Sequence, residues 1–374
     1  MRSTLAVRRV AAGALLMSIL VAPIGAAASG PAPGPSWPEP ATTRPHIEVP
    51  AAAPPHTVHL PTATDSHLLL SSKELQVTAP VRLLVFAPHP DDETLSAGGL
   101  IQRVLAKGGQ VRVVFVTNGD GYVDGVRREV RRSRTSRADF IEYGERRYGE
   151  AQHALHDLGL HKTDGVFLGF PDDGIDDLWA GHWSNRKPYR SPYTRFDRPL
   201  YKESLSRHVE YAGTDLEREI IGILREFQPQ WVLVPDPRDR HPDHCTTGVF
   251  VLDALRKLRH TGEPAFTRTQ TFSYLVHYPD YPASPAWVKE IAGAGVGGSV
   301  TARRELAGIH WLNMPLTPAE LARKRQAMSE YHSQIQVMNP FLEQFLRSFE
   351  LFGQLDAEQV IAVPHEYAAR FKRP

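Results

Sequence analysis

Four short apolar runs, separated by helical patterns, constrain the fold of this chain more than any other feature. The runs VRLLVFA at 81–87 and VRVVFVT at 111–117 are apolar almost throughout, as expected of strands buried on both faces. Two further runs are VFLGF at 166–170 and WVLVP at 231–235. Helical patterns fall between them, at about 92–107, 144–158 and 215–227. The alternation predicts an α/β fold with a doubly wound, mostly parallel sheet and helices on both faces.

The N-terminus has the features of a secretory signal peptide. Its first residues include three arginines, an apolar stretch runs from Val10 to about Ala22, and Ala26–Ala28 offers a cleavage site of small residues. We expect residues 1–28 to be removed near Ala28, so that the mature chain is secreted or periplasmic and keeps no membrane span. The alternative is an uncleaved anchor, but the apolar stretch is short and is interrupted by Gly and Pro.

The segment that follows differs in composition from the rest of the chain. Residues 29–78 begin with PAPGPSWPEP and VPAAAPP, which are rich in Pro and Ala. Such a stretch buries too little apolar surface to offset the entropy of ordering, so we expect a disordered linker. We expect residues 79–374 to form a single domain.

Charge and cysteine content limit the classes of partner and chemistry. The formal net charge is +1, and it falls to −2 without the three leader arginines. This balance suggests no polyanionic partner such as nucleic acid, and nothing points to an obligate protein partner. The single cysteine, Cys245, rules out an internal disulfide. We interpret it as a small buried hydrophobe and not as a nucleophile, because no Cys-His catalytic signature surrounds it.

Two clusters of histidine and aspartate lie directly after predicted strands. One is HPDDE at 89–93 and the other is HPDH at 241–244. Because parallel strands end at the same edge of a sheet, both clusters are expected at one edge, where such folds bind ligands. Imidazole nitrogen and carboxylate oxygen are zinc ligands, and a catalytic zinc keeps one position for water. The sequence therefore predicts one Zn²⁺ per chain, held by His89, Asp92 and His244.

The remaining polar residues of the two clusters suit the other roles that amide hydrolysis requires. Asp91 is a candidate general base for the attacking water. His241 lies one turn before His244, and a protonated His241 would stabilise the oxyanion or deliver a proton to the leaving amine. Glu93 and Asp243 would orient the ligands. Either tripeptide alone is more often a capped turn before a helix, but here two of them follow buried strands.

At this point the sequence resembles a known family. The segment PHPDDE at 88–93, followed by Gly98-Gly99, is similar to the first signature of the LmbE-like or PIG-L-type N-acetylglucosaminyl deacetylases, and HPDH is similar to the second. Weaker similarities extend the match over roughly 81–335; they lie at TNGDG (117–121), RYGE (147–150), FPDDG (170–174) and the segment 324–334. The resemblance implies zinc on His89, Asp92 and His244, a base at Asp91 and transition-state stabilisation by His241.

The segment 172–212 fits the family pattern poorly and is interpreted as an insertion that forms part of the cleft wall. It is rich in aromatic residues, of which Trp179, Trp183 and Tyr189 are candidates to stack on sugar rings. Ordinary packing of a long loop explains them equally well. Arg147 aligns with a substrate-contacting region of the family, although an arginine on a helix is more often solvated.

These observations favour a secreted, zinc-dependent deacetylase that hydrolyses the N-acetyl amide of an N-acetylglucosamine-type amino sugar or glycan. Two alternatives are another metal-dependent hydrolase of small amides and a non-catalytic carbohydrate-binding protein. The same Rossmann-like architecture also occurs in dinucleotide-binding enzymes, but no GxGxxG follows the first strand. Export favours an extracellular substrate such as cell-wall glycan, exopolysaccharide or an aminoglycoside-like compound.

Overall fold

The computed structural model describes residues 67–278, 281, 299–303, 306 and 309–358. All of them belong to the unit Ala53–Pro374. The expected signal peptide and most of the expected linker lie outside the described residues. The last part of that linker does not have the expected disorder, because residues 67–74 pair as a strand in the sheet.

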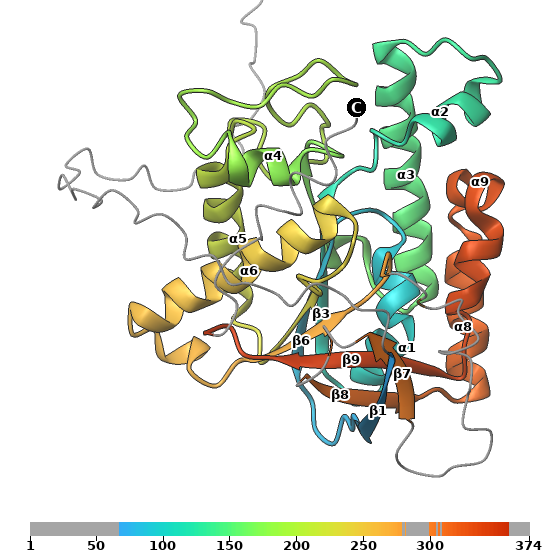
Figure 1. Ribbon diagram of the computed structural model, residues 1–374, viewed down its shortest axis with the longest axis vertical. Coiled ribbons are helices and arrows are strands. Elements are labelled where there is room, and N and C mark those ends of the chain that lie inside the picture. Colours follow the sequence, from blue (N-terminus) through green and yellow to red (C-terminus); the bar gives the residue numbers. More distant parts are fainter. Residues whose placement is uncertain (1–66, 279–280, 282–298, 304–305, 307–308, 359–374) are drawn as a thin grey trace, which may run out of the picture. The chain divides into compact units, whose positions relative to one another are not determined.

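The described strands form one nine-stranded sheet in the order β4-β3-β2-β5-β6-β9-β8-β1-β7 (Figure 1). They are β1 (His67–Glu74), β2 (Arg82–Ala87), β3 (Gln110–Thr117), β4 (Gly165–Phe170), β5 (Trp231–Pro235), β6 (Gln270–Tyr274), β7 (Ser299–Arg303), β8 (His310–Pro315) and β9 (Phe349–Leu355). The five strands from β4 to β6 are mutually parallel. β9 is antiparallel to both β6 and β8. The expected α/β fold is confirmed, with a mixed second half.

The strand order places a switch point between β2 and β5. From β2 the chain proceeds outward through β3 and β4, then returns to the other side of β2 and proceeds through β5 and β6. Loops that leave two neighbouring strands in opposite directions open a crevice at the carboxyl edge of such a sheet. This crevice is therefore the expected place for a ligand site.

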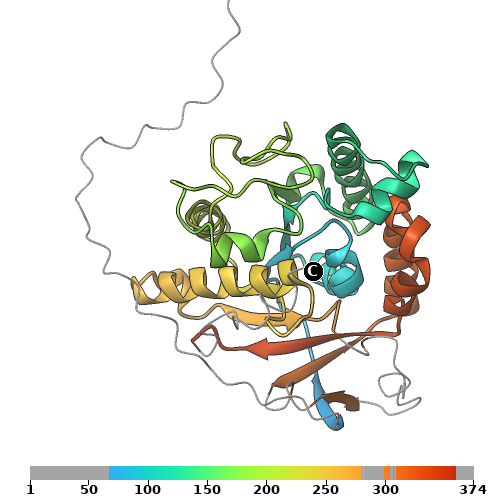
Figure 2. The same ribbon diagram turned by 45° about the horizontal axis from the view of Figure 1, so that its top comes forward.

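Helices cover both faces of the sheet. They are α1 (Asp92–Ala106), α2 (Val123–Val130), α3 (Arg137–Asp157), α4 (Ile175–Ala180), α5 (Gly213–Phe227), α6 (Pro242–His260), α8 (Pro318–Ser329) and α9 (His332–Leu342), with short 3₁₀ turns η1 (Lys162–Asp164), η2 (Pro264–Phe266) and η4 (Glu343–Phe345). Figure 2 separates α6 (yellow-orange, left) from α9 (orange-red, right).

Alternating side chains of the strands supply two apolar cores. Along β2, Leu83 and Val85 pack in one core with α1, α3 and α8. Leu84 and Phe86 pack in the other with α4, α5 and α6. This alternation explains why the run reads as apolar at nearly every position: each face of the strand is covered by helices.

One expected helix boundary is wrong. α3 begins at Arg137 and not near 144, because Ser136 and Asp139 form a capping box there: the Ser136 side chain accepts from the Asp139 N–H, and the Asp139 carboxylate accepts from the Ser136 N–H. Among the described residues, no helix combines the length and apolar character needed to cross a bilayer.

Candidate metal centre and active site

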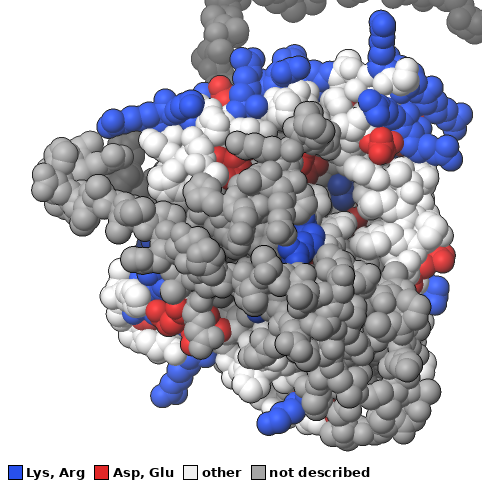
Figure 3. All heavy atoms as spheres, in the orientation of Figure 1, with Lys and Arg blue, Asp and Glu red and all other residues white. Residues whose placement is uncertain are grey.

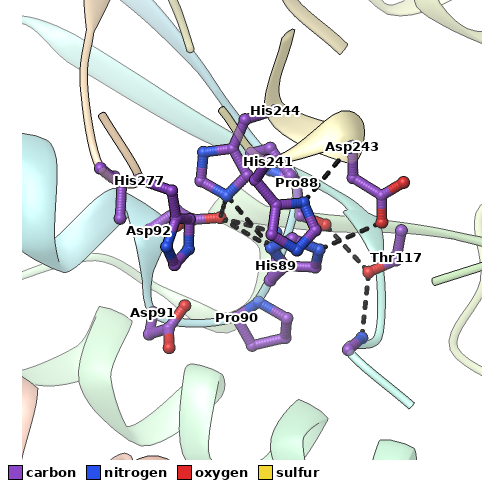
Figure 4. A network of polar contacts seen from close by, with 12 residues as sticks. Pro88, His89, Pro90, Asp91, Asp92, Thr117, His241, Asp243, His244 and His277 are labelled. Atoms are coloured by element: carbon purple, nitrogen blue, oxygen red, sulfur yellow. Dashed lines mark hydrogen bonds and ion pairs between the residues drawn. The ribbon is translucent and has the colours of Figure 1, made fainter. Parts of the chain in front are cut away.

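The two histidine-aspartate clusters meet because the strands that precede them are neighbours. β2 and β5 pair in parallel, with Leu83 opposite Trp231. The chain leaves both strands at the same edge, and the segments that follow converge there (Figure 4). α1 begins at Asp92 and α6 begins at Pro242, so both clusters occupy strand-to-helix turns.

Three donor atoms of His89, Asp92 and His244 form a nearly equilateral triangle. Asp92 Oδ2 is 3.3 Å from His89 Nδ1 and 3.2 Å from His244 Nε2, and the two ring nitrogens are 3.3 Å apart. All three side chains are buried. Donor atoms about 2.0–2.1 Å from one tetrahedral zinc ion lie about 3.3–3.4 Å from one another. The donor set and its spacing therefore fit a single zinc ion.

Carboxylates surround the outer nitrogens of the two histidines. His89 Nε2 lies 3.0 Å from Asp172 Oδ1 and 3.2 Å from Asp243 Oδ2. His244 Nδ1 lies 3.7 Å from Asp239 Oδ2. A carboxylate behind a metal-binding histidine fixes the orientation of the ring and increases its basicity, so both histidines are held with their inner nitrogens toward the triangle.

The electrostatics of the cluster favour a cation. Burial alone lowers the pKa of His244, but the carboxylates of Asp92 and Asp239 outweigh it and raise the pKa to about 9. Burial also lowers the pKa of His89, but the nearby carboxylates, Asp172 above all, raise it well above its usual range. An environment that stabilises a proton on buried imidazole also stabilises a metal ion in its place.

Asp91 has a different geometry from the ligand beside it. Its φ of 132° lies where side chains other than glycine are strained. Glu93 accepts a hydrogen bond from the Asp91 N–H at 3.2 Å and so holds this backbone in place. Burial raises the pKa of the Asp91 carboxyl to about 8, although Arg147 opposes the rise. The turn thus presents a buried carboxyl whose pKa lies close to neutral pH.

Arg147 points into the site and is not solvated. Its side chain is buried, with Nη2 3.5 Å from Asp91 Oδ2. It donates to the Pro90 carbonyl at 2.6 Å and to the Gly119 carbonyl at 3.1 Å. Gly119 has a φ of +66°, and a Cβ there would lie 1.8 Å from Arg147 Nη1. Only glycine leaves room for the guanidinium, which explains this residue of the 117–121 loop.

His241 caps α6 with its side chain. Its Nδ1 accepts the Asp243 N–H at 3.2 Å, and its ring centre lies 4.8 Å from that of His89. Burial, followed by the nearby His89 and His244, lowers the pKa of His241 well below its usual range. This direction favours the neutral ring, whereas the sequence interpretation used the protonated one. With Nδ1 accepting, the proton of the neutral ring resides on Nε2.

Asp243 has a structural position within the site. One carboxylate oxygen accepts the Asp173 N–H at 2.7 Å, and the other accepts the N–H groups of Gly174 and Ile175 at 3.1 and 3.0 Å. His89, His241 and Asp243 form a second group with metal-ligand spacing. Asp92 Oδ2 accepts one backbone hydrogen bond, from the His89 N–H at 2.9 Å, whereas the two Asp243 oxygens accept three, so the group of His89, Asp92 and His244 suits a metal better.

Three residues of the site were missed by sequence reasoning. Asp172 and Asp239 orient the histidines, and His277 lies with its ring centre 4.9 Å from that of His244. The Asp239 carboxylate also accepts the His277 N–H at 3.0 Å. All three follow the carboxyl ends of parallel strands, namely β4, β5 and β6. Applying the edge rule to every polar residue after a parallel strand would have found them.

Trp179, Trp183 and Tyr189 of the insertion do not line the pocket beside the donor cluster. Trp179 and Trp183 pack against Phe250 of α6, with ring centres 4.9 and 5.9 Å away. Tyr189 packs against the core beneath α4 to α6. The hypothesis that they stack on a sugar is not supported by these positions. Instead, the start of the insertion supplies Asp172 and Asp173 to the pocket wall.

A pocket of about 490 Å³ opens beside the cluster. His89, Asp91, Arg147, His241 and His277 line it near the cluster. The loop Gly121–Asp124 and Arg127 also line it, together with Gln334 and Met338 of α9. Pockets of this size accommodate small ligands such as a sugar unit.

Cys245 is buried, as expected, and burial raises the pKa of its thiol to about 12. A thiol held in that form is a poor nucleophile.

Comparison with known proteins bears on the central part of the chain. Residues 84–255 match the family model described as PIG-L: GlcNAc-PI de-N-acetylase. A 1D-myo-inositol 2-acetamido-2-deoxy-alpha-D-glucopyranoside deacetylase of Saccharopolyspora erythraea is 33% identical over 49% of this chain and 56% of its own length. A diacetylchitobiose deacetylase of Thermococcus kodakarensis is 25% identical over 60% of this chain and 72% of its own.

The chain spans about half the length of the curated relatives of the first kind, the 1D-myo-inositol 2-acetamido-2-deoxy-alpha-D-glucopyranoside deacetylases. Among solved structures, the antimicrobial reagent A40926 pseudoaglycone deacetylase is similar with a TM-score of 0.47 and 20% identity, over 75% of this chain and 99% of that one. The resemblance stated from the two His-Pro-Asp segments is confirmed over residues 84–255, the part of the chain that matches the PIG-L family model.

Proposed function

We propose that this chain is a secreted, zinc-dependent deacetylase that hydrolyses the N-acetyl amide of an N-acetylglucosamine-type amino sugar or glycan. The observation that carries the proposal is the triangle of donor atoms from His89, Asp92 and His244, with Asp91 beside it on the pocket wall. Deacetylases among the relatives support the reaction class. Secretion rests on the signal-peptide pattern of residues 1–28.

When bound by His89, Asp92 and His244, zinc supplies a Lewis acid that lowers the pKa of a water molecule and polarises the acetyl carbonyl. Asp91 accepts the proton that the attacking water loses. It then releases that proton to the nitrogen of the departing amine. Arg147 keeps the carboxylate of Asp91 in place through the 3.5 Å contact.

His241 stabilises the negative charge that develops on the carbonyl oxygen. Its Nδ1 is fixed as an acceptor by the Asp243 N–H, so the Nε2–H is the group available to donate. A neutral donor suits this role because it needs no proton from solvent. Asp172 and Asp243 orient His89, and Asp239 orients His244.

The test combines metal analysis with an amine-release assay on the secreted protein. We expect about one zinc per chain and metal-dependent release of an amine from N-acetylglucosamine or short N-acetylated glycans. Chelation should abolish turnover, and added zinc should restore it. Metal-dependent turnover of other small amides only would favour the alternative hydrolase. Stoichiometric metal with no turnover of any amide would favour a carbohydrate-binding protein.

N-terminal sequencing of the extracellular or periplasmic protein tests the localisation. A mature chain that begins near Ser29 agrees with the proposal. An intact chain with Met1 in the cytoplasm contradicts secretion and makes intracellular amino-sugar conjugates the relevant substrates.

A further inference from the structure

α2 and the loop after it concentrate positive charge beside the catalytic pocket. Between Val123 and Arg137 the chain has two acidic residues, Asp124 and Glu129, and six arginines, which are Arg127, Arg128, Arg131, Arg132, Arg134 and Arg137. All six arginines are exposed. Figure 3 shows Lys and Arg gathered at the upper right, where Figure 1 places α2. The surface around α2 is therefore strongly basic, although the net charge of the whole chain is only +1.

Several of these charges have no acidic partner. Two of the arginines do have one: Arg127 Nη1 lies 3.5 Å from Asp124 Oδ1, and Arg132 Nη2 lies 2.5 Å from Asp139 Oδ1. Within the described part of the chain, Arg128, Arg131 and Arg134 have no carboxylate within 4.0 Å. Like charges placed so close together repel one another, so this arrangement is stabilised when an anion binds between them.

The basic surface has a shallow, open groove that shares lining residues with the catalytic pocket. A groove of about 550 Å³ runs between α2 and α9. Arg128, Arg131 and Arg132 line its α2 side, and Gln336 and Val337 line its α9 side. Asp124 and Arg127 belong to both the groove and the catalytic pocket. A chain-like ligand with one unit at the metal site thus has a path over the arginines.

We propose that this groove binds the anionic groups of a polyanionic glycan whose N-acetylated unit occupies the catalytic pocket. The inference rests on the proposed function for the identity of that unit, and it narrows the substrate from glycans in general to those that carry carboxylate or phosphate groups. The planar, forked guanidinium groups of Arg128 and Arg131 match both kinds of oxyanion. Gln336 supplies an amide for sugar hydroxyls.

The shape and lining of the groove favour a glycan over other polyanions. None of the described groove residues is aromatic, whereas single-stranded nucleic acid is usually bound by stacking of its bases on aromatic rings. A membrane surface needs a protruding face with apolar side chains, and Val337 is the one large apolar residue among the described groove residues.

Equilibrium binding of two oligosaccharides of equal length tests the proposal without depending on turnover. Hyaluronan hexasaccharide alternates N-acetylglucosamine with glucuronate, and chitohexaose is its neutral counterpart. We expect the intact protein to bind the hyaluronan fragment about tenfold more tightly at low salt, and to lose this preference at high salt, where exposed charges are screened. The double variant R128Q/R131Q should reduce the preference to about the value for chitohexaose.

The matched control is K107Q/R268Q, which removes the same charge from exposed residues located before β3 and β6. It should keep the full preference. Equal binding of the two oligosaccharides, or an equal loss in both double variants, overturns the proposal. So does tighter binding of a hexathymidylate or of phosphatidylglycerol vesicles than of the hyaluronan fragment. If the protein prefers the hyaluronan fragment to chitohexaose but hydrolyses no amide, the result supports anion binding by the groove and contradicts only the proposed function.

Discussion

The tripeptide His-Pro-Asp occurs twice in the site, at His89–Asp91 before α1 and at His241–Asp243 before α6. Both copies follow a buried parallel strand and begin a helix. In the first copy the histidine is a candidate metal ligand, and the aspartate lines the pocket in a strained conformation. In the second copy the histidine caps the helix, and the aspartate is fully buried beneath the loop of residues 173–175.

The difference comes from what lies opposite each turn. The Asp91 carboxylate lies 3.5 Å from Arg147 Nη2 and lines the pocket. Asp243 faces three backbone N–H groups that need an acceptor. The two aspartates of the same tripeptide therefore differ in position: Asp91 lines the pocket, whereas Asp243 is held by backbone N–H groups. A motif supplies the side chains, whereas the residues around it decide how they are used.

The largest effect is expected from substituting His244, the proposed metal ligand, and it should differ from the effect of substituting His241, one turn before it. His244→Ala removes a corner of the donor triangle and should abolish both metal retention and turnover. His241→Ala leaves the triangle intact, so it should keep the metal and lose only part of the turnover. Metal analysis of both purified variants, alongside the amine-release assay, measures this. Full zinc occupancy in His244→Ala would refute the ligand assignment.

The two aspartates offer the next test, because the same substitution is made in the same tripeptide. Asp91→Asn should keep the metal and the fold while turnover falls by about 100-fold or more, the usual contribution of a positioned acid-base group. Steady-state kinetics with a metal assay checks it. Near-normal turnover would remove Asp91 from the mechanism, and lost metal would make it a ligand.

Asp243→Asn should have the opposite profile. The substituted amide replaces one accepting oxygen with a donor opposite buried N–H groups, which costs about 2–3 kcal/mol of unfolding free energy. Denaturant unfolding of the wild type and of both asparagine variants measures this difference. If Asp91→Asn were the more destabilised of the two, the distinction between the turns would be wrong.

The smallest expected effect concerns the cap of α6. His241→Ala removes the acceptor for the Asp243 N–H and should cost about 1 kcal/mol of unfolding free energy. His241→Asn keeps an acceptor and should recover that stability but not the turnover. Recovery of both by asparagine would show that His241 acts through the cap alone and donates nothing to the reaction.

Much of the parallel half of the sheet was predictable from local pattern. The strands β2, β3, β4 and β5 each read as a short apolar run because helices cover both faces, and the residues of α1 and α5 repeat with helical spacing. The antiparallel strands β8 and β9 were not predicted. Polar and apolar residues are mixed in both strands, HWLNMP and FELFGQL, without a clear period of two, and such short patterns do not distinguish strands from loops.

The sequence by itself determined which donor types follow β2 and β5, and the edge rule for parallel strands was sufficient to bring His89, Asp92 and His244 together. Only the tertiary structure decided how the neighbours act on them. The buried Arg147 beside Asp91, the neutral His241 and the packed Trp179 and Trp183 all depend on residues more than 50 positions away in the chain. Burial and through-space charge set these properties, and neither is a function of local sequence.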